Sequence, residues 1–221
     1  MANQPQTGKQ TRQAFVVAVS GASGAGKSAL VRCLVGLLED VVQLSFDDYI
    51  YLGNDPHVIQ AWLAGGAQPD ALQTPQLASD LRKLSAGQPV HLPHNRGILE
   101  PAEFILLEEP FGRARHEIAP LITLAAHLEP PPDVALARRI LRAMEAPERP
   151  EPERLLQEIA YDLQTYLIAG RVAYRAAAHA ARVALAGTTA RAGACAICRA
   201  RIRACIWTSS SGAWIVGAAA K

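Results

Sequence analysis

A glycine-rich turn between an apolar run and an amphipathic helix is the feature that most constrains the fold of this chain. Residues 15–19 read FVVAV, a non-alternating apolar run that is typical of a strand buried on both faces of a parallel sheet. After the turn, apolar residues recur at spacings of three and four, as on one face of a helix that begins near Lys27: Leu30, Val31, Leu34, Leu37 and Leu38. Strand, glycine turn and helix therefore follow in the order that a phosphate-binding loop requires.

The turn itself, residues 21–28 (GASGAGKS), matches the pattern G-x-x-x-x-G-K-[ST] at every fixed position. Glycines let the backbone point its N–H groups at phosphate oxygens, and the start of the helix adds the positive end of its dipole. Lys27 is predicted to reach the β- and γ-phosphates, and the hydroxyl of Ser28 to ligate Mg²⁺. The predicted nucleotide site comprises Gly21, Ala22, Ser23, Gly24, Ala25, Gly26, Lys27, Ser28 and Ala29.

Length and composition fit one globular domain, with or without a small lid. The chain has 221 residues, of which 50% are hydrophobic, enough to bury a substantial core. We expect a flexible leader over residues 1–13, a main domain over residues 14–186 and a C-terminal tail over residues 187–221. Cys195, Cys198 and Cys205 lie in that tail. A single C-x-x-C is weak evidence for zinc, so ordinary reduced thiols are favoured.

Charge and hydropathy argue against two kinds of partner. A formal net charge of +2 provides no basic field of the kind that nucleic-acid-binding proteins carry. The polar first residues, MANQPQTGKQTRQ, lack the apolar core of a signal peptide, and no uninterrupted apolar run is long enough to cross a bilayer. We therefore expect a cytoplasmic protein with no nucleic-acid or membrane partner, and leave a homo-oligomer open.

Two adjacent carboxylates follow the next apolar run. Residues 41–44 lead into SFDDY, which places Asp47 and Asp48 just past the carboxyl end of a predicted strand, where ligands bind in open α/β sheets. One carboxylate could accept the proton of an attacking hydroxyl, while the other could hold Mg²⁺ through water. Either one alone could equally cap the following turn. The position of the pair beside a phosphate loop favours chemistry.

A third apolar run, residues 104–107, is followed by Glu108. An acidic residue at this position suits a second Mg²⁺ contact, and a plain surface carboxylate is the alternative. The remaining pattern predicts an extended piece at 90–93, helices at 75–84, 113–125, 133–144 and 155–184, and strands at 126–129 and 183–185. These elements together predict an α/β protein with a mostly parallel sheet.

Basic residues outside the loop are weaker candidates. His94 lies on a predicted loop, where a lone histidine is more often solvated than functional. Arg138, Arg139 and Arg142 share the predicted helix 133–144, which is part of a lid at about residues 133–154. They could clamp phosphates, although a solvated basic face is the more frequent outcome of such a run.

Taken in order, these segments resemble the uridine kinase and phosphoribulokinase family of P-loop kinases over residues 15–185. VSGASGAGKS is followed by LSFDDY, in the place of the family's L-S-x-D-x-[FY], then by PDAL and by AGQPVHLP, which resembles G-x-x-V-x-x-P. PAEFILLEE resembles a family strand that ends in Glu, and DVALARRILR resembles the lid helix. The resemblance implies a three-layer P-loop NTPase fold with a mostly parallel central sheet and a helical lid.

The resemblance also implies roles for single residues. Asp47 resembles the carboxylate that activates the acceptor hydroxyl, and Glu108 the strand-end acid near Mg²⁺. Carried over in this way, the catalytic residues are Asp47, Lys27 and Arg139, the acceptor contacts Asp47, Tyr49, His94, Arg138 and Arg142, and the metal ligands Ser28, Asp48 and Glu108. The chain departs from the family at Ala135, where nucleoside kinases tend to carry arginine, and in lacking a clear R-G-x-D lid signature.

The sequence therefore predicts a kinase that uses ATP and Mg²⁺ to phosphorylate a hydroxyl of a small metabolite. The acceptor would be a nucleoside of the uridine or cytidine type, or a sugar-like alcohol. Two alternatives remain. A nucleotide-dependent switch would call for N-K-x-D and D-x-x-G stretches, and neither is apparent. A regulatory pseudokinase would bind ATP without transferring phosphate.

Overall fold

The computed structural model describes residues 13–50, 61–62, 64–145, 151–167, 171–186 and 215–220. Its centre is a five-stranded sheet in the order β2-β5-β1-β6-β7. The strands are β1 (Phe15–Gly21), β2 (Val41–Ser45), β5 (Phe104–Glu108), β6 (Leu124–Leu128) and β7 (Ile215–Ala220). Four of them run parallel, and β7 pairs antiparallel with β6. The predicted α/β class with a mostly parallel sheet is confirmed.

The register of the strands gathers the predicted site residues at one edge of this sheet. Glu108 at the end of β5 pairs with Val19 of β1 on one side and with Ser45 of β2 on the other. Gly21, the first glycine of the phosphate loop, pairs with Leu128 at the end of β6. The carboxyl ends of four parallel strands therefore meet where the loop begins, as expected for a ligand site in an α/β sheet.

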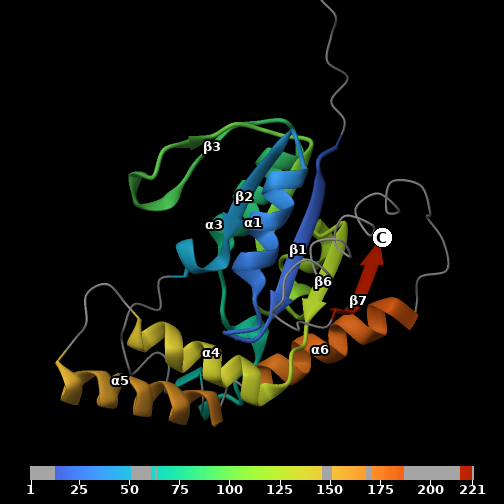
Figure 1. Ribbon diagram of the computed structural model, residues 1–221. Helices are drawn as coiled ribbons and strands as arrows, with labels where there is room; N and C mark the ends of the chain where they lie inside the picture. Colours follow the sequence, from blue (N-terminus) through green and yellow to red (C-terminus); the bar gives the residue numbers. More distant parts are fainter. Residues whose placement is uncertain are drawn as a thin grey trace, which may run out of the picture.

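Helices cover both faces of the sheet and make three layers (Figure 1). Alternate residues of β1 enter two separate cores, because successive side chains of a strand point to opposite faces. Val17 and Val19 pack with α1 (Lys27–Leu37), whereas Val16 and Ala18 belong to the core of α3 (Pro75–Ser85) and α6 (Arg171–Ala186). Burial of both faces explains why the strand sequences are apolar without alternation.

Two further helices follow β6: α4 (Pro132–Met144), which lies within the segment 133–154 predicted as a lid, and α5 (Pro152–Thr165). They lie beside one another at the end of the sheet toward which the arrowhead of β6 points (Figure 1). A small antiparallel hairpin of β3 (Val90–His91) and β4 (Ile98–Leu99) completes the described elements. None of the described helices is both long and apolar enough to span a membrane.

Two secondary-structure predictions are wrong. Residues 113–125 form two short 3-10 turns, Gly112–Ala114 and Ala119–Leu121, before β6 begins. Pro120 has no backbone N–H to donate to a helical hydrogen bond. The Arg113 guanidinium donates to the carbonyls of Ala119 and Ile122 at 3.1 and 2.7 Å, so these carbonyls bind a side chain in place of a helical N–H. The strand predicted at 183–185 lies within α6, whose alanine-rich sequence favours a helix.

Other predictions are adjusted or lie outside the described residues. The helix predicted at 155–184 is two helices, α5 and α6, with residues 168–170 outside the description. The leader up to residue 12, the middle of the lid at 146–150 and the three cysteines of the tail also lie outside it. Cys33 on α1, which the sequence analysis did not consider, is disulfide-bonded.

Candidate active site

The phosphate loop is shaped by two glycines that no other residue could replace without displacement. Gly24 has φ +82°, and a Cβ there would lie 2.1 Å from the carbonyl oxygen of Ala135 on α4. Gly21 has φ +139°, and its Cβ would lie 2.4 Å from the carbonyl oxygen of Leu128. The left-handed backbone region and these close approaches both require glycine. The loop is thus seated directly against β6 and the lid helix.

The start of α1 is arranged to receive an anion. Gly26, in a left-handed conformation, is the cap residue of α1, and no side chain hydrogen-bonds to this helix end in the described structure. The first turn of α1 also contains no acidic residue. Its free amide groups and the positive end of the helix dipole are therefore available to phosphate oxygens.

Lys27 lies among charges from three other elements. Its side chain is half-buried, and Nζ donates to the Ala22 carbonyl at 3.2 Å. Burial lowers the pKa of Lys27, and the nearby carboxylates of Glu108 and Asp47 oppose this effect. The charge of Arg142 on α4 acts in the same direction as burial. The fold therefore brings Lys27, Asp47, Glu108 and Arg142 to one place, although they are far apart in sequence.

Ser28 and Glu108 form the best-defined oxygen pair of the site. The Ser28 hydroxyl donates to Oε1 of Glu108 at 2.8 Å. Mg²⁺ is commonly held by one or two protein oxygens together with substrate phosphates. The described residues contain no group of three or more His, Cys, Asp or Glu that could hold a metal ion alone. A serine hydroxyl and one carboxylate beside a phosphate loop fit Mg²⁺ that is shared with a nucleotide.

The two adjacent aspartates have different environments. Both lie on the 3-10 turn η1 (Phe46–Asp48), which follows β2 directly. Asp47 is exposed, and its charge acts on Lys27. Asp48 instead pairs with Arg96 of the loop between β3 and β4. That ion pair connects the loop between β3 and β4 to η1. His94 lies on the same loop, two residues before Arg96, and is therefore held close to η1.

The remaining predicted acceptor and lid residues divide into buried and accessible ones. Tyr49 is 2% exposed, and its hydroxyl donates to Oδ2 of Asp80 on α3 at 3.1 Å, so it anchors η1 to the core. His94 is exposed, with φ +57°. Arg138 and Arg139 are half-buried on α4, and the charge of Arg139 acts on Tyr174 of α6.

Tyr174 was not predicted from the sequence. Burial raises the pKa of its phenol, while a hydrogen bond from the backbone of Ser23 in the phosphate loop lowers it. Its ring stacks on Phe111, with centroids 5.9 Å apart and an interplanar angle of 21°. It also lines a cavity of about 370 Å³ beside Ala22 and the buried His127. Nothing in the sequence relates residue 174 to residue 23, because only tertiary packing brings them together.

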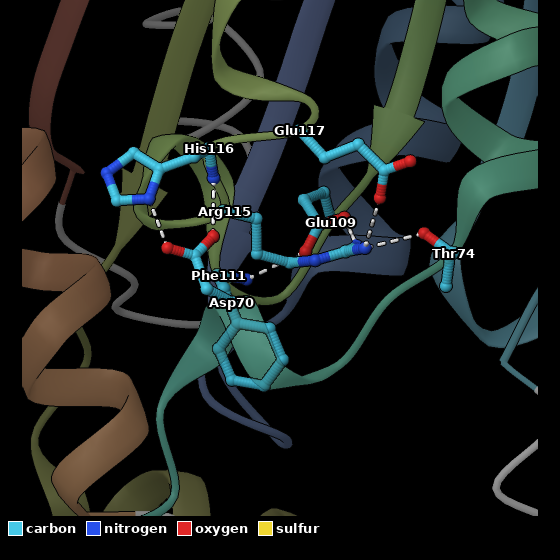
Figure 2. A network of polar contacts seen from close by, with 7 residues as sticks. All are labelled: Asp70, Thr74, Glu109, Phe111, Arg115, His116 and Glu117. Carbon is cyan, nitrogen blue, oxygen red and sulfur yellow. Dashed lines mark hydrogen bonds and ion pairs between the residues drawn. The ribbon is translucent and has the colours of Figure 1, made fainter.

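A buried polar network was also missed (Figure 2). Glu109 is fully buried and pairs with Arg115, whose Nη1 lies 2.7 Å from Oε2 of Glu109. Nη2 of Arg115 donates to the hydroxyl of Thr74 at 2.6 Å. Burial raises the pKa of Glu109 to about 7, and Arg115 opposes the rise. The acidic pair at residues 108 and 109 was the one available signal, and only its first member was assigned a role.

Comparison with known proteins adds several relatives at modest identity. No family model matches the chain. The chain is 28% identical to "Uridine-cytidine kinase 2-B" of Danio rerio over 178 residues, 71% of this chain and 68% of that protein. It is 25% identical to "Uridine kinase" of Latilactobacillus sakei over 67% of this chain and 75% of that protein. For "Uridine kinase-like protein 5" of Arabidopsis thaliana the identity is 25%, over 62% of this chain and 32% of the relative.

One solved structure, "Structure of the Pnkp1/Rnl/Hen1 RNA repair complex", aligns over 72% of this chain and 47% of that chain. Its TM-score is 0.34 and its identity 14%, values too low to support an argument. The sheet order, the glycine loop and the helix that follows define the class: an α/β protein of the P-loop NTPase fold. Within that class, the chain is related to the uridine kinase-like family of P-loop kinases.

Proposed function

We propose that this chain is an ATP-dependent kinase that transfers the γ-phosphoryl group to a hydroxyl of a nucleoside or a sugar-like alcohol. The observation that carries the proposal is the convergence at one sheet edge of a phosphate loop, a Ser28 to Glu108 oxygen pair and the exposed carboxylate of Asp47. The names of the relatives reported above, a uridine-cytidine kinase, a uridine kinase and a uridine kinase-like protein, support the same class of reaction.

The nucleotide would bind with its phosphates in the loop at residues 21–28. Amide groups of the loop and of the start of α1 would contact phosphate oxygens, and Lys27 would neutralise the charge of the transferred group. Ser28 and Glu108 would hold Mg²⁺, which when bound offsets the negative charge of the phosphates. The cavity beside Ala22 and Tyr174 would be large enough for the base of the nucleotide.

Asp47 would orient the acceptor and take its proton. As the hydroxyl oxygen bonds to the γ-phosphorus, the bond from that phosphorus to the bridging oxygen breaks, and ADP leaves. The exposed position of Asp47 beside the charge of Lys27 suits a base that must meet a substrate. Arg139 or a neighbouring arginine of α4 would stabilise charge on the transferred oxygens, and His94 and Arg138 would contact the acceptor.

The substitution Asp47→Asn tests this assignment. Acceptor-dependent ADP release should fall by about 10²- to 10⁴-fold, the usual range for loss of a general base, while ATP affinity stays within about threefold. The acceptors would be nucleosides, sugar phosphates and other alcohols, with the phosphorylated product identified by mass. Glu39→Gln, an exposed carboxylate outside the site, is the control.

Two results would contradict the proposal. If no acceptor stimulates ADP release by the wild-type protein although ATP binds, the chain is a switch or a pseudokinase. If Asp47→Asn transfers phosphate as fast as the wild-type protein, the chain is a kinase but the base is a different group.

A further inference from the structure

The buried ion pair of Arg115 joins several segments of the proposed active site. Arg115 is 1% exposed and Glu109 fully buried. The guanidinium contacts Glu109 and Thr74, and it also lies 3.9 Å from Oε2 of Glu117. Apolar residues of similar volume often replace such buried charges without loss of stability. A role in holding the geometry of the site would account for this pair better than stability does.

The first segment that Arg115 holds is the end of β5. Glu109 follows Glu108 directly, and successive residues of a strand point to opposite faces. The Glu109 N–H donates to the carbonyl of Val19 at 3.0 Å, and its side chain accepts from the Phe111 N–H at 3.2 Å and from Arg115. With the backbone and the Glu109 side chain both fixed, Glu108 is directed toward Ser28.

The second segment is η1, which carries Asp47. Cζ of Arg115 lies 4.9 Å from the ring centroid of Phe46, the residue before Asp47. The Phe46 ring also meets Phe111 edge to face, at 5.9 Å and 89°. A guanidinium over an aromatic face is an attractive, geometrically specific contact. The base of η1 therefore rests on the same side chain that fixes Glu109.

The third segment is the start of α3. Thr74 is the residue before α3, and its hydroxyl accepts from Arg115 rather than capping the helix. Asp80 of α3 in turn accepts from Tyr49 at the end of η1. Both ends of η1 are thus connected to elements that Arg115 contacts. Figure 2 shows the guanidinium between Glu109 and Thr74, with Glu117 nearby.

We propose that Arg115 is a positioning residue that keeps Asp47 on η1 and Glu108 on β5 in fixed relation to one another. This inference rests on the proposed function, in which these two carboxylates meet the acceptor and Mg²⁺. Arg115 touches neither carboxylate and acts only through Glu109 and Phe46. Loss of its fork-shaped contacts should therefore lower kcat strongly and leave the affinity for Mg²⁺-free ATP nearly unchanged, because misplacement of reacting groups by about 1 Å can cost about 10²-fold in rate.

The experiment separates positioning from stability with three variants. Arg115→Lys keeps the charge and removes the planar fork. Arg115→Met combined with Glu109→Leu replaces the buried pair by apolar side chains. The melting temperature of this double variant should be close to that of the wild-type protein. The neighbouring Arg113→Lys is the matched control, because Arg113 bonds only to carbonyls of residues 119, 122 and 123 in the described structure.

The expected result is a kcat about 10- to 100-fold lower in Arg115→Lys and in the double variant, with the Kd of ATP measured without Mg²⁺ within about twofold. Arg113→Lys should lower the melting temperature and keep kcat. A double variant with wild-type stability and wild-type kcat would overturn the proposal, because the pair would then be structural only.

A second measurement distinguishes this failure from failure of the proposed function. The gain in ATP affinity on adding Mg²⁺ should shrink about tenfold in the double variant if Glu108 is no longer held. If the wild-type protein binds Mg²⁺ and ATP but phosphorylates no acceptor, the proposed function fails. The gain in ATP affinity on adding Mg²⁺ then tests by itself whether Arg115 positions Glu108. An unchanged gain would then overturn the inference, and a wild-type protein that does not bind ATP would overturn both proposals.

Discussion

The phosphate loop and the Arg115 network lie at the same edge of the sheet and use charge in opposite ways. In the loop, Lys27 is half-buried, and its one hydrogen bond that the structure gives is to the Ala22 carbonyl. Carboxylates act on Lys27 through space and do not neutralise it by contact. In the network, Arg115 is 1% exposed and pairs with Glu109 at 2.7 Å. In the proposed function the first cation is kept for a ligand, whereas the second is satisfied by the protein.

The pKa shifts of Lys27 and Glu109 show the same difference between the loop and the network. Burial lowers the pKa of Lys27 and raises that of Glu109, because removal from water penalises the charged form of both groups. In the network the penalty is partly offset within the fold, by Arg115. In the loop it would remain until an anion binds, so a phosphate would gain more from Lys27 than from a fully hydrated lysine. Substitutions in the two regions should therefore affect different quantities.

The largest expected effect comes from removing the cation of the loop. Lys27→Ala should lower phosphoryl transfer about 10³-fold, the usual scale for loss of one preorganised electrostatic contact. The melting temperature should not fall, because Lys27 has no buried partner that would be left unpaired. Transfer is measured by acceptor-dependent ADP release, and stability by thermal unfolding. Lys83→Ala, an exposed lysine on α3, is the control and should keep full activity. A large loss of stability in Lys27→Ala would show that the loop is held by its own charges.

The second prediction concerns the backbone of the loop. Gly24→Ala adds a Cβ within 2.1 Å of the Ala135 carbonyl at φ +82°, whereas Gly26→Ala meets nothing within 4 Å at φ +97°. Both substitutions strain the backbone by about 1–2 kcal/mol, and only Gly24→Ala adds overpacking of about 1–3 kcal/mol. The free energy of unfolding should therefore fall by about 2–5 kcal/mol for Gly24→Ala and by about 1–2 kcal/mol for Gly26→Ala. Equal losses in urea unfolding would mean that the lid helix moves aside freely.

The same contrast explains what the sequence could predict. A phosphate loop is built from contiguous residues whose backbone conformations depend on local glycines, so residues 21–28 and α1 were predicted correctly. Asp47 and Glu108 were selected because each follows an apolar strand, and parallel strands end at one sheet edge. The network depends on Thr74, Glu109 and Arg115, whose contacts span up to 41 residues. No local pattern distinguishes such residues from surface charges.

Two long-range contacts that the sequence did not indicate have the same origin. The patterned stretch at residues 113–125 was expected to form a helix, but Arg113 bonds to carbonyls that a helix would have used. Asp48 pairs with Arg96, 48 residues further along the chain, a contact that the sequence did not indicate, and its role as a metal ligand stays a prediction. In both cases a long side chain reached a group that sequence periodicity does not register. The elements that local propensity governs, α1, α3 and α4, were predicted to within two residues.

The smallest expected effect tests the network through pH. The pKa of Glu109 is raised from 4.5 to about 7 by burial, so the folded state binds this proton more tightly than the unfolded state. The stabilisation from this group is fully present below about pH 4.5 and is lost as the pH rises through about 7. The free energy of unfolding should therefore decline over this range by on the order of 1–3 kcal/mol more in the wild-type protein than in Glu109→Gln.

Urea unfolding at several pH values between about 4.5 and 8 measures that difference. Thr74→Val is the matched control, because it removes another partner of Arg115 without removing a titratable group. It should lower stability and leave the pH dependence as in the wild-type protein. If Glu109→Gln has the same pH dependence as the wild-type protein, Arg115 neutralises Glu109 fully throughout this range. The penalty of burial would then be absent from the network, and the contrast with Lys27 would be sharper than the pKa shifts indicate.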